Sequence, residues 1–151
     1  SGVETQAVVY KDRLFVHLRN HKIFCLDAQT GAIIWAYKRS MSYKTTLQRA
    51  SRPFISKDKL YVGFADGYLV AFSAQDGSLL WETKLAEGVK FPDVDTAPKL
   101  LFGKIFAGVS EGEIFVLDPK SGKVLSKLPF SSLRELKLIK RRCLKNYLRI
   151  K

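Results

Sequence analysis

The sequence predicts an all-β fold built from three consecutive copies of one pattern of strands and turns. The first observation is an internal repeat: Leu14-Phe15-Val16 recurs as Leu60-Tyr61-Val62, 46 residues later, and again as Ile105-Phe106-Ala107 after a further 45. The second is an alternation of side chains with a period of two, which is typical of strands. The third is a set of turn sequences at matching places in each copy, which indicates a repeated structural unit.

Each copy contains a first hairpin whose turn is visible in the sequence. In the second copy, strands are expected at residues 60–64 and 68–72, with Asp66-Gly67 between them. This pair favours a tight hairpin because glycine adopts a positive φ freely. Glu111-Gly112 occupies the same place in the third copy. In the first copy the pair is Asn20-His21, with Asn20 expected in the left-handed conformation.

A second hairpin follows in each copy, and its turn begins with Asp or Ser and ends with Gly. The three turns are 27–31, 73–77 and 118–122. The first side chain can accept hydrogen bonds from turn amides, and the closing glycine suits a left-handed position. In the strand after this turn the first two copies carry Trp35 and Trp81. Both are expected to pack against the neighbouring copy.

Four antiparallel strands in about 45 residues are typical of a β-propeller blade. The sequence accordingly divides into blades at residues 3–42, 43–87 and 88–130, with residues 131–151 outside the repeat. A blade has apolar side chains on both faces, so blades stack face to face. An arc of three leaves an apolar face at each end. This predicts either a homo-oligomer that forms through these blade faces or an end covered by residues 131–151.

Residues 131–151 carry most of the basic excess of the chain. The net charge is +12, and this segment holds eight Lys/Arg and one acidic residue, Glu135. Apolar residues spaced by three or four predict a short basic amphipathic helix, with Ser132 and Glu135 placed as a capping box. The helix is expected either to cover a blade or to bind a membrane surface or an acidic partner. A truncated or frameshifted gene would also explain the abrupt end of the repeat. No sequence-specific nucleic-acid motif accompanies the basic residues, so no specific nucleic acid is expected.

The sequence contains no pattern that predicts catalysis, a metal site or a bound cofactor. His17 and His21 flank a hairpin without a carboxylate or cysteine at metal-ligand spacing, so exposed turn and strand positions are expected. Cys25 and Cys143 lie far apart, and Cys25 is expected in the core. We expect no signal peptide at residue 1, and no apolar run reaches about 18 residues. We therefore expect a protein that is not an enzyme.

Several stretches resemble known families. LYVGFADGYLVAFSAQDGSLLW, residues 60–81, resembles the PQQ-like repeat of quinoprotein dehydrogenases and of non-enzymatic scaffolds. LQRASRP at 47–53 and PDVDTAP at 92–98 resemble two interblade loops of the BamB family of outer-membrane protein assembly factors. The resemblance covers about residues 3–130. A complete propeller of this family has more blades than the three expected here.

The resemblance to the BamB family implies a partner and a set of binding residues. In that family the corresponding loops dock a POTRA domain of the barrel-inserting protein BamA. Carried over by position, Leu47 is an apolar anchor, and Asp93 and Asp95 are acidic contacts. Gln48 and Tyr68 fall where the family has arginines. The resemblance further implies a bacterial periplasmic protein at the outer membrane, with membrane contact only through a lost lipid anchor or the basic tail.

Two other functions remain open at this point. The first is a fragment of a PQQ-dependent quinoprotein dehydrogenase. Such enzymes need a complete ring around the quinone, a Ca²⁺ site and commonly a vicinal disulfide, and three blades cannot enclose an axial cofactor. The second is a truncated propeller whose basic tail binds an acidic surface.

Overall fold

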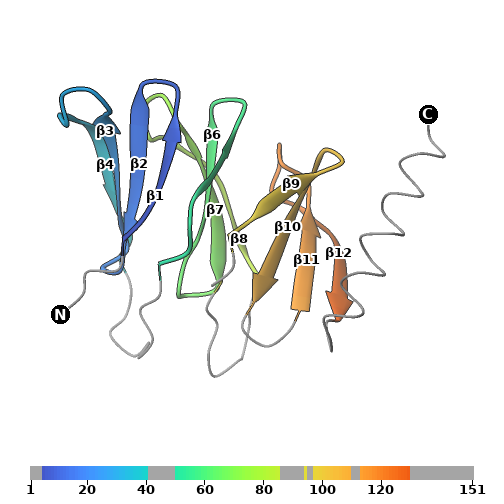
Figure 1. Ribbon diagram of the computed structural model, residues 1–151. Helices are drawn as coiled ribbons and strands as arrows, with labels where there is room; N and C mark the ends of the chain where they lie inside the picture. Colours follow the sequence, from blue (N-terminus) through green and yellow to red (C-terminus); the bar gives the residue numbers. More distant parts are fainter. Residues whose placement is uncertain (1–4, 41–49, 86–93, 95–96, 110–112, 130–151) are drawn as a thin grey trace.

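The computed structural model describes residues 5–40, 50–85, 94, 97–109 and 113–129, which form three four-stranded antiparallel sheets (Figure 1). Blade 1 contains β1 (Thr5–Tyr10), β2 (Arg13–Leu18), β3 (Lys22–Asp27) and β4 (Ile33–Lys38). Blade 2 contains β5 (Phe54–Ser56), β6 (Lys59–Gly63), β7 (Tyr68–Ser73) and β8 (Leu79–Lys84). Blade 3 contains β9 (Lys99–Leu101), β10 (Lys104–Val109), β11 (Glu113–Leu117) and β12 (Val124–Pro129). The all-β partial propeller is confirmed, and the expected tail helix lies outside the described residues.

The three blades share one strand register, including an irregularity at the same place. Neighbouring strands of each sheet follow chain order, and the pairing of the last two strands shifts by one residue shortly after the second turn. In this register Trp35 lies opposite Cys25 and Trp81 opposite Ala71. Ser126 takes the equivalent place opposite Val116 in blade 3. Blade 3 therefore has a serine where the other two blades have a tryptophan.

The second hairpin turns have the geometry that the sequence predicts. Oδ1 of Asp27 accepts the backbone amides of Gln29 and Thr30 at 2.8 and 2.9 Å. The closing residue Gly31 has a φ of 73°, and its equivalents in blades 2 and 3 have 75° and 73°. These positive values explain why glycine closes each turn.

The first hairpin of blade 1 differs from the prediction in one residue. His21, with a φ of 63°, adopts the left-handed conformation that the sequence analysis assigned to Asn20. His21 stands where blade 2 has Gly67, which has a φ of 87°. The turn requires a positive φ directly before the returning strand, so position in the turn outweighs the preference of asparagine for this region.

Two buried cores lie between the blades, and each draws side chains from two sheets. The core between blades 1 and 2 contains Phe15, Ile23, Cys25, Trp35, Leu60, Val62, Phe64, Val70, Phe72 and Ala74. The core between blades 2 and 3 contains Tyr61, Leu69, Ala71, Trp81, Leu85, Val94, Ile105, Ala107, Val109, Phe115 and Leu117. Both faces of blade 2 are therefore covered. The predicted burial of Cys25 and the predicted interblade packing of both tryptophans are confirmed.

Backbone hydrogen bonds between turns define two ends of the arc. At the end that we call the turn end, the amide of Ala28 donates to the carbonyl of Asp12 at 2.9 Å, which joins the β1–β2 and β3–β4 turns. At the other end, the amide of Leu85 donates to the carbonyl of Gly67 at 2.8 Å. We call this second end the loop end, because β4 and β8, the last strands of blades 1 and 2, end there (Figure 1).

Candidate partner-binding face at the loop end

The structure describes one of the five residues predicted to bind a partner. Tyr68 begins β7 at the loop end and is half-buried. Leu47, Gln48, Asp93 and Asp95 lie outside the described residues. Their roles stay predictions. The described ends of the two interblade connections nevertheless show how these segments are attached to the sheets.

The connection from blade 1 to blade 2 is attached through Ser51. Its hydroxyl donates to the carbonyl of Gly63 at 2.8 Å and accepts the amide of the same residue at 3.1 Å. Ser51 is 1% exposed. The buried hydroxyl thus satisfies both the N–H and the C=O of the last residue of β6, as a neighbouring strand would. This holds Ser51 against the sheet.

The connection from blade 2 to blade 3 is attached to the same turn through Val94. Its amide donates to the carbonyl of Phe64 at 3.2 Å. Its side chain lies against Gly63 so closely that a Cβ at Gly63 would stand 2.6 Å from Cγ1 of Val94. We call residues 63–68 the anchor turn, because both interblade connections are fixed on it.

His17 and His21 are buried, and the expectation of exposed positions is wrong. His17 is 0% and His21 6% exposed. Nδ1 of His17 lies 2.9 Å from the carbonyl oxygen of Ser51, and the His17 ring meets that of Phe64 edge to face at 5.2 Å. His17 lies two residues after Phe15 on β2, so the two side chains share the face of blade 1 that stacks on blade 2. The interblade core therefore buries His17.

Burial changes the protonation of both histidines. It lowers the pKa of His17 to about 4, an effect that the Ser51 carbonyl opposes and the neighbouring His21 reinforces. Burial also lowers the pKa of His21, which Asp66 raises and Arg39 lowers by smaller amounts. Nε2 of His17 and Nδ1 of His21 have no hydrogen-bond partner. Both rings are therefore neutral at pH 7.

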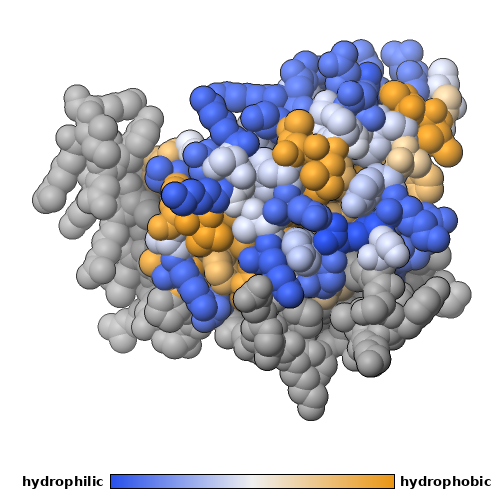
Figure 2. All heavy atoms as spheres, turned by 180° about the vertical axis from the view of Figure 1, so that it is seen from behind, coloured by the Kyte–Doolittle hydropathy of each residue, from blue (hydrophilic) through white to orange (hydrophobic). Residues whose placement is uncertain are grey.

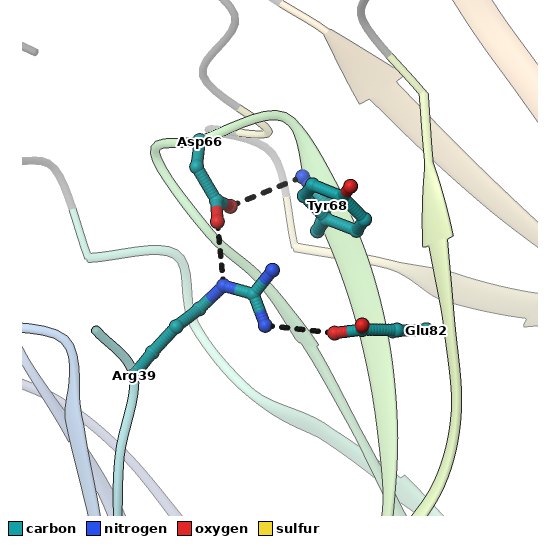
Figure 3. A network of polar contacts seen from close by, with 4 residues as sticks. All are labelled: Arg39, Asp66, Tyr68 and Glu82. Carbon is teal, nitrogen blue, oxygen red and sulfur yellow. Dashed lines mark hydrogen bonds and ion pairs between the residues drawn. The ribbon is translucent and has the colours of Figure 1, made fainter. Parts of the chain in front are cut away.

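Arg39 joins blade 1 to blade 2 through two ion pairs, one to the anchor turn and one to β8 (Figure 3). Its Nε lies 2.6 Å from Oδ2 of Asp66, and its Nη1 lies 2.9 Å from Oε2 of Glu82. The Arg39 side chain is only 10% exposed. Burial acts to lower the pKa of Arg39, but the hydrogen bonds to the two carboxylates outweigh it, so the net shift is upward. Arg39 is a fixed positive charge with each carboxylate on a separate nitrogen.

Tyr68 forms part of this network through its ring and its amide. The guanidinium carbon of Arg39 lies 4.6 Å from the centre of the Tyr68 ring, and Nζ of Lys84 lies 6.0 Å from it. Oδ1 of Asp66 accepts the Tyr68 amide at 3.3 Å. These contacts hold the Tyr68 ring in place at the end of the anchor turn.

Sequence analysis missed the residues that support this face. Arg39 and Ser51 belong to no repeated motif, so spacing gave no signal for them. Gly63 carried a weak signal, because a glycine within a strand pattern indicates a close approach by another segment. His17 lies two residues after the apolar Phe15 on β2, and this spacing was a usable signal that both side chains face the core.

A cavity at the turn end provides the main alternative location for a site. It has a volume of about 390 Å³, lies between blades 1 and 2, and is lined partly by Lys11, Arg13 and Asp58. Arg13 donates from Nη1 to the carbonyls of Ala74 and Gln75 at 2.9 and 2.7 Å. Nζ of Lys11 lies 2.8 Å from Oδ1 of Asp58. These charged groups bond across the blade junction, so the lining joins the two blades.

Among the described residues, no group of three or more His, Cys, Asp or Glu side chains is arranged to hold a metal ion. In the same residues, no helix has the length and apolar character needed to cross a membrane.

Comparisons with known proteins agree with the repeat. Three stacked four-stranded blades that are joined through tryptophans define a propeller of the PQQ-like repeat class. The family model described as outer membrane protein assembly factor BamB matches residues 1–141, and the chain belongs to this family. No curated protein matches the chain in sequence.

Solved structures of BamB and of alcohol dehydrogenases show the same fold. BamB from Moraxella catarrhalis is 22% identical with a TM-score of 0.70, over 83% of this chain and 40% of that one. A europium-containing methanol dehydrogenase is 21% identical with a TM-score of 0.77, over 89% and 26%. The quinohemoprotein alcohol dehydrogenase from Comamonas testosteroni is 27% identical with a TM-score of 0.71, over 85% and 21%. The chain spans less than half the length of each of these structures.

Proposed function

We propose that the chain is a non-catalytic protein-binding scaffold of the BamB type, which docks a POTRA-like domain through its interblade loops. The observation that carries the proposal is the anchor turn. Ser51 and Val94, which belong to different interblade connections, both bond to the backbone of residues 63–64. Two recognition segments attached to one rigid support lose less conformational entropy on binding than two independent loops.

The proposed contacts combine one apolar anchor with acidic groups. Leu47 would insert into the partner, and Asp93 and Asp95 would accept hydrogen bonds from it. Tyr68 and Gln48 would contribute contact surface where the family has arginines. By the same reasoning the protein acts in the bacterial periplasm as an outer-membrane-associated component of β-barrel protein assembly.

Replacement of both loop aspartates tests the docking mode. The Asp93→Ala/Asp95→Ala variant should bind a purified cognate POTRA domain more weakly by about 1–3 kcal/mol, because charge-assisted hydrogen bonds are lost. Isothermal titration calorimetry measures this change. Asp12→Ala, which removes an exposed carboxylate at the turn end, is the matched control and should bind like the parent. Equal affinity of the double variant and the parent would refute docking through these aspartates.

The similarity to methanol dehydrogenase supports one competing function, that of a fragment of a PQQ-dependent enzyme. We expect no alcohol- or sugar-dependent dye reduction by the chain after incubation with PQQ and Ca²⁺. Dye reduction that requires both the chain and PQQ would overturn the scaffold proposal and favour the enzyme.

Self-association through the end faces is a further part of the proposal. The outward face of blade 1 carries Leu14, Val16, Phe24 and Leu26, which belong to neither buried core of the described residues. Apolar surface of this kind favours association in water. The expected homo-oligomer would bury this face against the last blade of another copy.

A further inference from the structure

Both histidines of the chain are buried at the loop end. Figure 2 shows hydrophilic side chains around separate apolar patches on one face of the molecule, where water can solvate a charged group. His17 and His21 have no such access to water, because they are 0% and 6% exposed. Nε2 of His17 and Nδ1 of His21 also lack a hydrogen-bond partner. An imidazolium at either position would therefore be neither hydrated nor paired at that nitrogen.

The contact of His17 with Ser51 fixes the tautomer of the ring. Nδ1 of His17 lies 2.9 Å from the carbonyl oxygen of Ser51. A carbonyl oxygen only accepts hydrogen bonds, so Nδ1 carries the proton and Nε2 is the bare nitrogen. A second proton would have to bind at Nε2, where the described residues provide no acceptor. His17 can therefore become charged only when its surroundings open to water.

Among the described residues, no charged group near His17 offsets this cost. The Phe64 ring lies 5.2 Å from that of His17, and on it lies the guanidinium of Arg39 at 5.1 Å. Arg39 is positive, and Asp66 already binds it at 2.6 Å. His21 further disfavours a charge on His17. The titratable or charged side chains around His17 there are His21 from the β2–β3 turn, Tyr37 from β4, Arg39 after β4 and Asp66 from the anchor turn.

The sheet and the anchor turn cannot move away from His17 at low cost. Within blade 1, His17 is paired with Gln6 on β1 and with Ile23 on β3. Phe64 belongs to the anchor turn, whose backbone also receives the amide of Val94 at 3.2 Å. Exposure of His17 on these sides would separate paired strands or the two stacked blades.

The interblade connection at Ser51 can move without either separation. The Ser51 hydroxyl bonds to the carbonyl and the amide of Gly63 at 2.8 and 3.1 Å, and the Ser51 carbonyl accepts from His17. The next residue, Arg52, is exposed. Displacement of this short segment brings water to the His17 ring, so it is the least costly way to admit a charge there.

We propose that the contact between His17 and Ser51 is a proton-sensitive latch, in which protonation of His17 releases Ser51 from Gly63 while the blades stay folded. The released serine no longer satisfies the backbone groups at the end of β6, so the connection leaves the anchor turn. Because that turn supports the proposed docking of a partner, docking and protonation of His17 exclude each other. This consequence rests on the proposed function, whereas the latch itself does not.

The amide of Gly63 reports the state of the latch, because Oγ of Ser51 accepts its hydrogen bond at 3.1 Å. Nuclear magnetic resonance measures its hydrogen exchange in the full chain at pH 7 and pH 5, relative to an unstructured peptide at the same pH. We expect its protection to fall on the order of twentyfold, because the His17 pKa is about 4 in the closed state and about 6.5 when the ring is hydrated. The amide of Val94, on the same turn but without a histidine, is the matched control and should keep its protection.

Three variants assign the effect to the latch. His17→Asn does not titrate at this position and should make the protection of Gly63 independent of pH, whereas His21→Asn should retain the fall. Ser51→Ala removes the acceptor and should leave the Gly63 amide weakly protected at both pH values. The comparison of Gly63 with Val94 in the parent chain needs no variant. Equal losses at both amides, or constant protection of Gly63, would overturn the proposal.

A saturating purified POTRA domain separates the latch from the proposed function. Docking to the closed connection suppresses its opening, so the protection of Gly63 at pH 5 should return towards its value at pH 7. Absence of binding at either pH would contradict the proposed function and leave the latch of the free chain intact. Binding that leaves the protection of Gly63 at pH 5 unchanged would overturn the coupling between docking and protonation.

Discussion

Burial decides which charged contacts stabilise the blades. Arg39 and Lys11 each pair with an aspartate across the junction of blades 1 and 2, at 2.6 and 2.8 Å. The Arg39 and Asp66 side chains are 10% and 22% exposed, whereas those of Lys11 and Asp58 are 64% and 61% exposed. Water screens the second pair, and fixing two mobile side chains costs entropy, so similar distances correspond to different contributions to stability.

Truncation of Arg39 should therefore be more damaging than truncation of Lys11. Arg39→Ala leaves Asp66 partly buried without its ion pair, and we expect a loss of about 2 kcal/mol in the free energy of unfolding. Lys11→Ala is the matched control and should leave the urea midpoint unchanged within error. Equal midpoint shifts for the two variants would contradict the role assigned to burial.

The burial of His17 predicts a loss of stability on acidification. Its pKa is about 4 in the folded chain and about 6.5 when unfolded, so between these values the unfolded state binds more protons. Stability should fall as the pH drops from 6.5 towards 4, by on the order of 3 kcal/mol for this group, and then level off. Urea titrations at several pH values measure the slope.

The matched variants for this effect are His17→Asn and His21→Asn. Asparagine retains a donor near the position of Nδ1 of His17 but does not titrate, so His17→Asn should flatten the pH dependence. His21→Asn should flatten it less, because His21 also lies near Asp66, which favours its charged form. Parallel curves for the parent and His17→Asn would exclude His17 as the source.

At the scale of the blade, stability resides in the junctions. A sheet buries little by itself, and both cores draw residues from two blades. The closing glycine of the second hairpin combines two roles there, since it takes a positive φ and leaves room for a tryptophan. The blade 1 copy of this glycine has only the first role within the described residues.

A pair of substitutions separates these two roles. Gly77→Asn and Gly31→Asn introduce the same side chain at φ values of 75° and 73°, so backbone strain is the same. Only Gly77→Asn places a Cβ against Trp35. We expect Gly77→Asn to lower the free energy of unfolding by about 1–3 kcal/mol more than Gly31→Asn. Equal losses in chemical denaturation would show that the glycines serve only the turn.

At the scale of the molecule, the arc has two unlike end faces. The outward face of blade 1 carries Leu14, Val16, Phe24 and Leu26, whereas the outer strand of blade 3 has Ser126 in place of a tryptophan. Association between copies should therefore be driven by apolar burial alone and be weaker than the internal junctions.

Sedimentation equilibrium across a wide concentration range tests this association. We expect an average mass above 17.1 kDa that rises with concentration. Leu14→Lys places a charge on the outward face of blade 1 and should shift the equilibrium towards monomer, whereas Gly31→Asn should not. A constant 17.1 kDa for the parent at high concentration would contradict self-association through the end faces.

The sequence by itself determined the strands, the turns and the number of blades. These depend on local patterns, namely alternation along a strand and glycine where a turn needs a positive φ, and each pattern occurs three times. Repetition also made Trp35 and Trp81 recognisable as packing residues. The local pattern did not identify His21 as the residue with a positive φ, because Asn20 is adjacent and asparagine has the higher propensity for that conformation.

Only the tertiary structure decided how the two interblade connections are held. Ser51 and Val94 meet at Gly63 although 43 residues separate them in the chain, and no local pattern encodes that contact. The burial of His17 and the ion pairs of Arg39 likewise depend on how blade 1 stacks on blade 2. Alternation of side chains along a strand predicts which side of the sheet each side chain faces. The stacking of the blades decides whether that side meets water or another sheet.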